Sequence, residues 1–423
     1  MRPCVARPDG SLEVLGGLRP AGQSGSVIQS LDAAEMVPLP DGAALMHLPG
    51  RTALTLDSRG RPFAAEGFLP VAAVLPVGYV RTLLPAAREE TGRQRLPLFG
   101  YAAVAERRGR LMVAAAASDD FAWWRPSLRA PRGDLESALA AARQALPGNR
   151  LVDHLAVCAL QNRCYTAQNT LLRQYEGALP ASPACNADCL GCISLQSDGE
   201  APAPQPRMRF APTAEELAGL ASYHLAGEGA AIVSFGQGCE GEPLTRDDAL
   251  VNATAEIRRR HPAATIHINT NGSKPRMLER LIEAGCDSVR ISAISFTDSV
   301  FRAYYRPAGY GLDDVIACGR VMAASGGQVC LNLLTFPGLT DAPKEIERTA
   351  AACRDMRVQQ VQWRSLNVDP GWLIAVLERG GHDLGRGIGV RAAMEELRRR
   401  LPGVEHGNFT RPVTKPVARP AQA

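Results

Sequence analysis

The chain has 423 residues, of which 46% are hydrophobic and 21% charged, with a formal net charge of +4. That length and apolar content can bury one large core or two moderate ones, and so small a charge excludes a strongly basic nucleic-acid binder as the default. The N-terminal residues lack a continuous apolar segment, and the most apolar run, from Pro70, contains three prolines and Arg81. We therefore expect a cytoplasmic protein with no secretory signal, no membrane partner and no nucleic-acid partner.

Residues 1–177 are interpreted as a separate α+β domain of unknown role. A hairpin is predicted to turn near Arg108–Gly109, and helices are predicted over 133–146 and 150–172. The pair Trp123–Trp124 is either a stacking site for a ring or a contact between this domain and the next.

Residues 178–375 alternate between strand and helix patterns. A capping box, Thr213-x-x-Glu216, begins one helix, and Gly285 closes another. Strands are predicted over 230–237, 264–271, 287–295, 328–336 and 358–367. With a short strand before Cys185, this order predicts six parallel strands in right-handed βαβ units. The predicted fold class is therefore α/β, a partial (βα)6 TIM-like barrel.

Several of these strands are too polar for a sheet covered on both faces. In the strand over 264–271, one face carries Ile266 and Ile268, and the other carries His267 and Asn269. Similar polar positions follow on later strands: Arg290, Ser292, Asn332, Gln362 and Arg364. The pattern predicts a barrel with a polar lumen, and the alternative is an open sheet with exposed strand ends.

Eleven cysteines in a chain without an export signal argue against a disulfide framework, because cytosolic thiols are kept reduced. Four of them lie on apolar periodic segments and are interpreted as small buried hydrophobes: Cys158, Cys286, Cys318 and Cys353.

Cys185, Cys189 and Cys192 form the spacing C-x3-C-x2-C on one loop. Three thiolates can hold a four-iron cluster with one iron left open. A zinc site would need a fourth ligand, for which Cys239 or His224 would have to fold back. The third possibility is that the cysteines are inert.

Three stretches together resemble the radical S-adenosylmethionine (radical SAM) superfamily: CNADCLGC after a short strand, SFGQGCEGEPL after the next, and INTNG at the end of the third. The resemblance covers about Ala178 to Trp372, and within the superfamily it is similar to a poorly characterised subgroup with QGCEGEP. It implies one 4Fe–4S cluster on Cys185, Cys189 and Cys192, with S-adenosylmethionine bound at the open iron. Reductive cleavage to a 5′-deoxyadenosyl radical and hydrogen abstraction from a substrate would follow. An electron donor such as flavodoxin or ferredoxin is implied as a partner, and the substrate, a peptide, protein or small molecule, is not specified.

The resemblance also assigns roles to individual residues. It implies that Gly241, Glu242 and Pro243 meet the amino group of S-adenosylmethionine. Candidates for its carboxylate, ribose or adenine are Asn269, Asn271 and Ser292. Arg306 and Arg364 would pair with a carboxylate of S-adenosylmethionine or substrate, or form ordinary ion pairs. The chain departs from the family at Gly191, where an aromatic residue is usual, and at Glu240, which replaces a glycine.

For two more residues the sequence leaves two interpretations open. Cys239 is either a packing residue or a reactive thiol, and His267 is either a hydrogen-bonded core histidine or a catalytic one. Residues 376–423 are interpreted as a basic, partly disordered C-terminal extension. The competing function is a non-enzymatic zinc or iron–sulfur module for binding or redox sensing.

Overall fold

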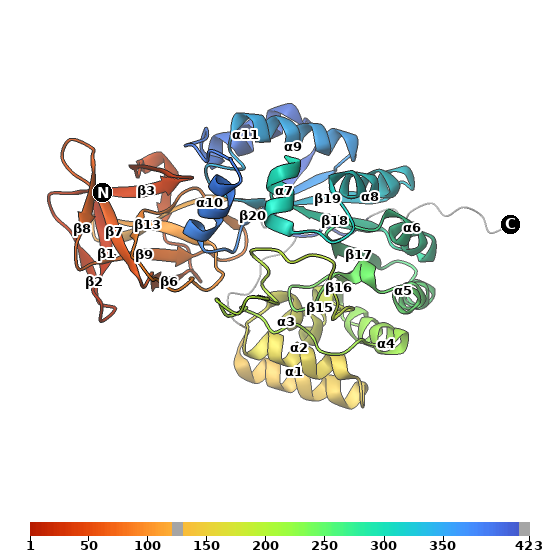
Figure 1. Cartoon of the computed structure of the whole chain (residues 1–423). Coiled ribbons are helices and arrows are strands. Elements are labelled where there is room, and N and C mark those ends of the chain that lie inside the picture. Colours follow the sequence, from red (N-terminus) through yellow and green to blue (C-terminus); the bar gives the residue numbers. More distant parts are fainter. Residues whose placement is uncertain (121–129, 414–423) are drawn as a thin grey trace.

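A computed structural model describes residues 1–120 and 130–413 of the chain. An antiparallel β-domain lies on one side, and a curved parallel sheet with helices on its outer face makes up the rest (Figure 1). The Trp123–Trp124 pair and residues 414–423 lie outside the described residues. None of the helices within the described residues combines the length and the apolar character that a membrane span requires.

The β-domain consists of an eight-stranded and a six-stranded sheet. The first contains β1 (Arg2–Ala6), β2 (Leu12–Val14), β5 (Met36–Pro38), β6 (Ala44–His47), β9 (Leu69–Val74), β10 (Tyr79–Arg81), β13 (Tyr101–Arg107) and β14 (Arg110–Ala117). The second contains β3 (Arg19–Ser24), β4 (Val27–Ser30), β7 (Arg51–Leu56), β8 (Pro62–Ala65), β11 (Leu84–Pro85) and β12 (Ala87–Glu89), and a 3-10 turn, η1 (Ala33–Glu35), precedes β5.

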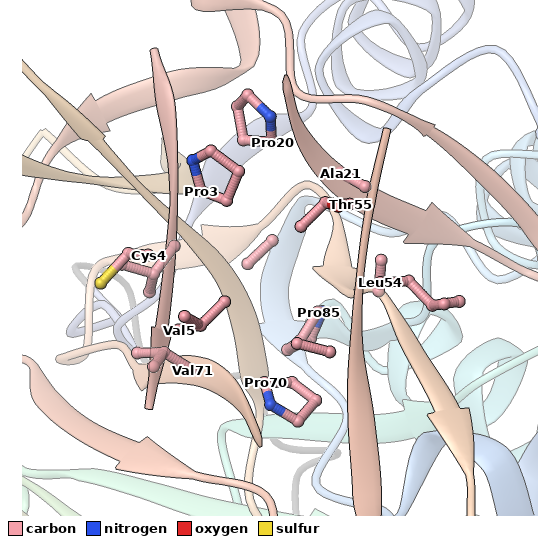
Figure 2. A pocket seen from close by; sticks show the side chains of 14 residues that line it. Pro3, Cys4, Val5, Pro20, Ala21, Leu54, Thr55, Pro70, Val71 and Pro85 are labelled. Carbon is pink, nitrogen blue, oxygen red and sulfur yellow. The ribbon is translucent and has the colours of Figure 1, made fainter. Parts of the chain in front are cut away.

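The interior of the β-domain is closely packed. Figure 2 shows proline and small apolar side chains of both sheets pointing toward one another, among them Pro3, Val5, Ala21 and Pro70. The cavity between them measures about 20 Å³, which holds roughly one water molecule. This cavity has no room for a ligand larger than a water molecule. The predicted hairpin is confirmed as β13–β14, with Arg108 and Gly109 both at positive φ in the turn.

Three helices follow: α1 (Arg132–Ala145), α2 (Arg150–Leu160) and α3 (Tyr165–Leu172). The prediction of one helix over 150–172 is wrong, because the chain turns at Arg163, whose φ is 51°, and resumes at Cys164, the N-cap of α3. α3 packs against the first strand of the parallel sheet and α2 against the helix that follows it. Where the chain divides into domains stays a prediction.

The parallel sheet has seven strands in chain order. They are β15 (Gln174–Ala178), β16 (Gly229–Phe235), β17 (Thr265–Thr270), β18 (Ser288–Ala293), β19 (Gln328–Thr335), β20 (Gln360–Ser365) and β21 (Glu405–Gly407). The connecting and flanking helices are α4 (Ala214–Leu225), η2 (Pro243–Thr245), α5 (Asp248–Arg260), α6 (Pro275–Ala284), α7 (Asp298–Tyr305), α8 (Leu312–Ala324), α9 (Pro343–Asp355), α10 (Pro370–Arg379) and α11 (Val390–Arg400). The six predicted strands and the partial barrel are confirmed.

The seventh strand was not predicted. β21 pairs in parallel with β20, so residues expected to form a loose extension complete the sheet. The chain then crosses beneath the barrel: Phe409 and Thr410 are buried, and the Val413 amide donates to Thr265 Oγ1 at the start of β17, at 2.9 Å. This segment, residues 408–413, runs from the end of β21 to the start of β17.

The β-domain is attached at the opposite end, where β20 finishes. The Arg51 guanidinium pairs with Asp369, the N-cap of α10, at 2.6 Å, and both side chains are buried. The amide of Arg81 donates to Ser365 Oγ at 3.0 Å. These contacts place the β-domain beside the carboxyl ends of the last strands.

Candidate functional site

The three clustered cysteines lie on the loop that follows β15, at the carboxyl end of the parallel sheet. All three are half-buried free thiols. Burial, followed by the charges of Cys192 and Cys185, raises the pKa of Cys189, and burial also raises the pKa of Cys185. Thiols that raise one another's pKa in this way are close neighbours. A bound cation would offset the repulsion between their thiolate charges.

The cysteine loop is held in place by the end of α7. The amides of Asp188 and Leu190 donate to the carbonyl oxygens of Tyr305 and Tyr304 at 3.1 and 2.9 Å. Arg306 adopts φ 44°, so the chain turns sharply there before Pro307 forms a bridge with the loop. These backbone hydrogen bonds position the loop without using its thiols.

One cation reaches a thiol of the loop. Arg207 donates through Nη2 to Cys192 Sγ at 3.3 Å and through Nε to Ser194 Oγ at 3.1 Å. The guanidinium places a positive charge beside this sulfur. The sequence did not identify Arg207, because it lies fifteen residues beyond Cys192 in an irregular segment.

Gly191 departs from the family pattern for a steric reason. A Cβ at this position would lie 2.6 Å from the carbonyl oxygen of Asn367 and 2.6 Å from Tyr304 Oη. An aromatic side chain does not fit there. Tyr304, on α7, already fills the space.

No fourth zinc ligand joins the cysteine loop from the two residues proposed for it. In the part of the chain that the structure describes, the one set of three metal-ligating side chains whose ligand atoms lie within 4.8 Å of one another is His154, Cys158 and Cys239, and it contains no thiol of the loop. His224 is buried on α4, under Gly177. The wider spacing of the loop thiols favours a multi-iron cluster over a single ion.

The Gly241-Glu242-Pro243 turn lies directly against the cysteine loop. The amides of Gly241 and Glu242 donate to the carbonyl oxygens of Ser182 and Ala184 at 2.7 and 2.8 Å. A Cβ at Gly241 would lie 2.0 Å from the Ala184 oxygen. Only glycine allows the two backbones to approach this closely.

The Glu242 carboxylate is engaged within the protein. It accepts hydrogen bonds from the Leu244 amide at 3.0 Å, the Asn271 amide at 2.8 Å and the Thr270 hydroxyl. Burial raises its pKa to about 7, against the opposing effect of these donors. The side chain therefore joins the turn to the end of β17. Thr270, within the INTNG stretch, is a contributor that the sequence analysis did not single out.

Glu240, the residue in place of a glycine, has a similar role. Its carboxylate accepts from the amides of Gln237, Ala181 and Ser182 at 2.6, 2.7 and 2.9 Å. Burial raises its pKa to about 8. Glu240 thus connects the turn to the segment leading into the cysteine loop.

The two asparagines of β17 are placed at the site but bind chain atoms. Asn269 donates through Nδ2 to the Phe235 carbonyl at 2.9 Å, and its Oδ1 accepts from His267 Nε2 at 3.1 Å. Asn271 donates to Asn186 Oδ1, in the cysteine loop, at 2.9 Å. Both side chains orient loops around the site.

The lumen is polar, as predicted. Ser292 accepts from Asn332 Nδ2 at 2.9 Å, and Arg290 donates to Gln362 at 2.8 Å and to Thr410 at 3.3 Å. The buried Glu176 on β15 bonds to Ser234, and its pKa is lowered by Arg290 and His267 despite its burial. Glu176 and Thr410 were missed, because neither stands in a polar strand pattern.

The three remaining predicted residues, His267, Arg306 and Arg364, have different environments. His267 is a core histidine: it bonds to Ser288 and Asn269, and burial lowers its pKa to about 4. Arg306 forms an ion pair with Asp188 of the cysteine loop at 3.3 Å, with nearly half of each side chain exposed. Arg364 contacts no carboxylate; it donates to the Asn408 carbonyl, and its Nε is buried without a partner among the described residues.

A cavity of about 150 Å³ lies between the β-domain and the end of β20. Among the described residues that line it, Arg364 is the only charged one, and the lining also contains Tyr79, Asn367 and Asn408. Because the Asn367 carbonyl also touches Gly191, the cavity adjoins the cysteine loop.

The comparisons with known proteins agree with this geometry. Residues 179–351 match the family model "Radical SAM superfamily". They contain the cysteine loop, the Gly241-Glu242-Pro243 turn and the INTNG stretch. The chain is 33% identical over 134 residues to the GTP 3',8-cyclase of Paenarthrobacter nicotinovorans, a match that covers 31% of this chain and 37% of that enzyme. The chain thus spans little more than a third of the length of this curated relative.

Solved structures with a similar fold include methylornithine synthase (PylB), with a TM-score of 0.40 and 14% identity over 63% of this chain and 77% of that one. Another is SuiB of Streptococcus suis bound to S-adenosylmethionine, with a TM-score of 0.38 and 14% identity over 59% and 55% of the two chains. The family model thus identifies residues 179–351 as a radical SAM domain, the domain of a superfamily that uses a 4Fe–4S cluster and S-adenosylmethionine.

Proposed function

We propose that this chain holds one 4Fe–4S cluster on Cys185, Cys189 and Cys192 and catalyses reductive cleavage of S-adenosylmethionine. The observation that carries the proposal is the set of three neighbouring, half-buried thiols on a loop whose backbone is hydrogen-bonded to the end of α7. When bound, the two cofactors supply an electron-driven cleavage of a carbon–sulfur bond and hydrogen abstraction from a substrate. Flavodoxin or ferredoxin is the proposed electron donor.

The protein's part in this chemistry is to orient the S-adenosylmethionine amino group. The Gly241 carbonyl accepts no hydrogen bond from the described residues, although it lies beside the cysteine loop. A free carbonyl in this position suits an ammonium donor. Glu242 supports it indirectly, because its carboxylate fixes the turn to Thr270 and Asn271.

The substrate is proposed to enter through the cavity beside β20 and to carry an acidic group. Arg364 lines this cavity, its buried Nε–H has no partner among the described residues, and the described lining contains no carboxylate. A guanidinium with a free donor is well suited to a carboxylate or phosphate, on a small molecule or on a peptide. Ser292 and Asn332 provide further polar groups on the neighbouring strands.

The test is anaerobic incubation of the purified chain with S-adenosylmethionine and a reductant. The wild-type chain should contain about four irons and release 5′-deoxyadenosine, measured by mass spectrometry. Replacing Cys185, Cys189 and Cys192 by Ala should abolish both. Cys353→Ala, a buried cysteine on α9 away from the loop, is the matched control and should leave both intact.

Iron loading and 5′-deoxyadenosine release that survive the triple substitution would contradict the proposal. The competing zinc or redox-sensing module would instead show a stoichiometric metal and no cleavage of S-adenosylmethionine by the wild-type chain.

A further inference from the structure

A second group of metal-ligating side chains lies outside the cysteine loop. His154 and Cys158 are four residues apart on α2, so they share one face of the helix. Cys239 approaches them from the turn after β16. One ligand atom from each of the three lies within 4.8 Å of those of the other two. The sequence separates these residues by eighty positions, and nothing in its spacing predicts their convergence.

The surroundings of the group leave its donor atoms directed at one another. Cys158 and Cys239 are buried, at 0% and 2% exposure. His154 Nε2 is buried and has no hydrogen-bond partner among the described residues. The imidazole packs edge-on against Phe210, with ring centroids 6.2 Å apart, which restrains its orientation. A buried ring nitrogen without a partner is costly unless something absent from the chain occupies it.

The kind of ion follows from the donors. One imidazole nitrogen and two thiols are a soft ligand set, which favours Zn²⁺ and disfavours Mg²⁺ and Ca²⁺. Zn–S and Zn–N bonds of about 2.3 and 2.0 Å place tetrahedral ligands about 3.3–3.8 Å apart. The spacing of this group requires only small side-chain adjustments to reach that geometry.

A fourth cysteine lies close along the chain. Cys164, the half-buried N-cap of α3, donates its amide to the Cys158 carbonyl at 2.9 Å. Its thiol is outside the set of ligand atoms that lie within 4.8 Å of one another, so its side chain would have to turn toward the group to act as a ligand.

We propose that His154, Cys158 and Cys239 bind one zinc ion, and that Cys164 completes the site when its side chain turns toward the ion. The ion fastens α2 to the turn that continues into Gly241. It is a structural centre distinct from the cysteine loop, and its existence does not depend on the function proposed above.

The test uses the full-length chain in which Cys185, Cys189 and Cys192 are replaced by Ala, so that metal on the cysteine loop does not contribute. Grown with zinc and purified, this variant should retain about one Zn²⁺ per chain by elemental analysis. Titration of its metal-free form with Co²⁺ should give the visible bands of tetrahedral cobalt and a thiolate charge-transfer band. Adding Cys158→Ser and Cys239→Ser should remove the zinc and both spectral features. Adding Cys353→Ser instead should change neither.

A protection experiment keeps the proposal testable if the variants fail to fold. In the wild-type chain, Zn²⁺ should slow alkylation of Cys158 and Cys239 at least tenfold, and a chelator should reverse this. Equal zinc content with and without Cys158 and Cys239 would overturn the proposal. So would metal-independent alkylation, or a Cys158–Cys239 disulfide in the metal-free chain as isolated.

Discussion

The buried ion pair between Arg51 and Asp369 should contribute strongly to stability. Its two side chains are 3% and 0% exposed, and the charged atoms are 2.6 Å apart. Removing one partner of such a pair leaves the other charge buried, at a cost of about 3–5 kcal/mol. Glu89, 3.8 Å from Arg51, offsets part of that cost, so the lower end of the range applies.

Asp369 also caps α10, accepting from the amides of Gly371 and Trp372, and loss of a cap costs about 1 kcal/mol. Asp369→Ala should therefore lower the free energy of unfolding by about 4 kcal/mol. Adding Arg51→Met should recover about 2 kcal/mol, because the uncompensated charge is gone while the lost cap remains.

The assay is urea unfolding followed by tryptophan fluorescence, since Trp372 lies in the first turn of α10. Asp355→Ala is the control: it removes an ion pair with Arg320 whose side chains are 41% and 60% exposed, and should cost less than about 1 kcal/mol. The reasoning is refuted if Asp369→Ala is no more destabilising than this control, or if the Arg51→Met substitution adds to the damage.

Three further predictions concern the site and its supports. Gly241→Ala should abolish 5′-deoxyadenosine release, because its Cβ would meet a carbonyl oxygen at 2.0 Å, whereas Gly133→Ala, with open space around it, should leave release unchanged. Arg207→Met should lower the reduction potential of the cluster, because it removes a positively charged hydrogen-bond donor from Cys192. Spectroscopic redox titration measures this potential, and an unchanged value would show that Arg207 does not influence the cluster. Asp341, buried, has its pKa raised from 3.8 to about 6, chiefly by burial, so its stabilising contribution is complete below pH 3.8 and is lost as the pH rises through 6. The free energy of unfolding should therefore fall by about 3 kcal/mol over this pH range, and Asp341→Asn should abolish that fall. Urea unfolding at several pH values measures it, and an unaltered fall in the variant would show that Asp341 is not its source.

The sequence predicted best what depends on local periodicity. The helices α4 to α9 and the strands β15 to β20 follow hydrophobic patterns that each segment carries by itself. β21 escaped prediction because three residues, Glu405–Gly407, carry no such pattern, and they are a strand only because β20 offers an unpaired edge.

At the site, the cysteine loop, the Gly241-Glu242-Pro243 turn and the INTNG stretch could be predicted from their residue types and their order along the chain. The partners of each side chain were not. Glu242 accepts from β17, and Cys239 lies beside Cys158, because strands adjacent in the sheet, and the helices packed on them, bring together residues distant along the chain. In the sequence, the Glu242 carboxylate next to Gly241 suggested ligand binding. In the structure, its hydrogen bonds instead join this turn to the end of β17.

The crossing of residues 408–413 ties the end of the chain to the middle of the parallel sheet. Thr410 is buried and accepts a hydrogen bond from Arg290 of β18, and the Val413 amide donates to Thr265 at the start of β17. The segment that follows the last strand therefore supports two strands far from it in the sheet order. Truncating the chain before Asn408 would for this reason loosen β17 and β18 as well as β21.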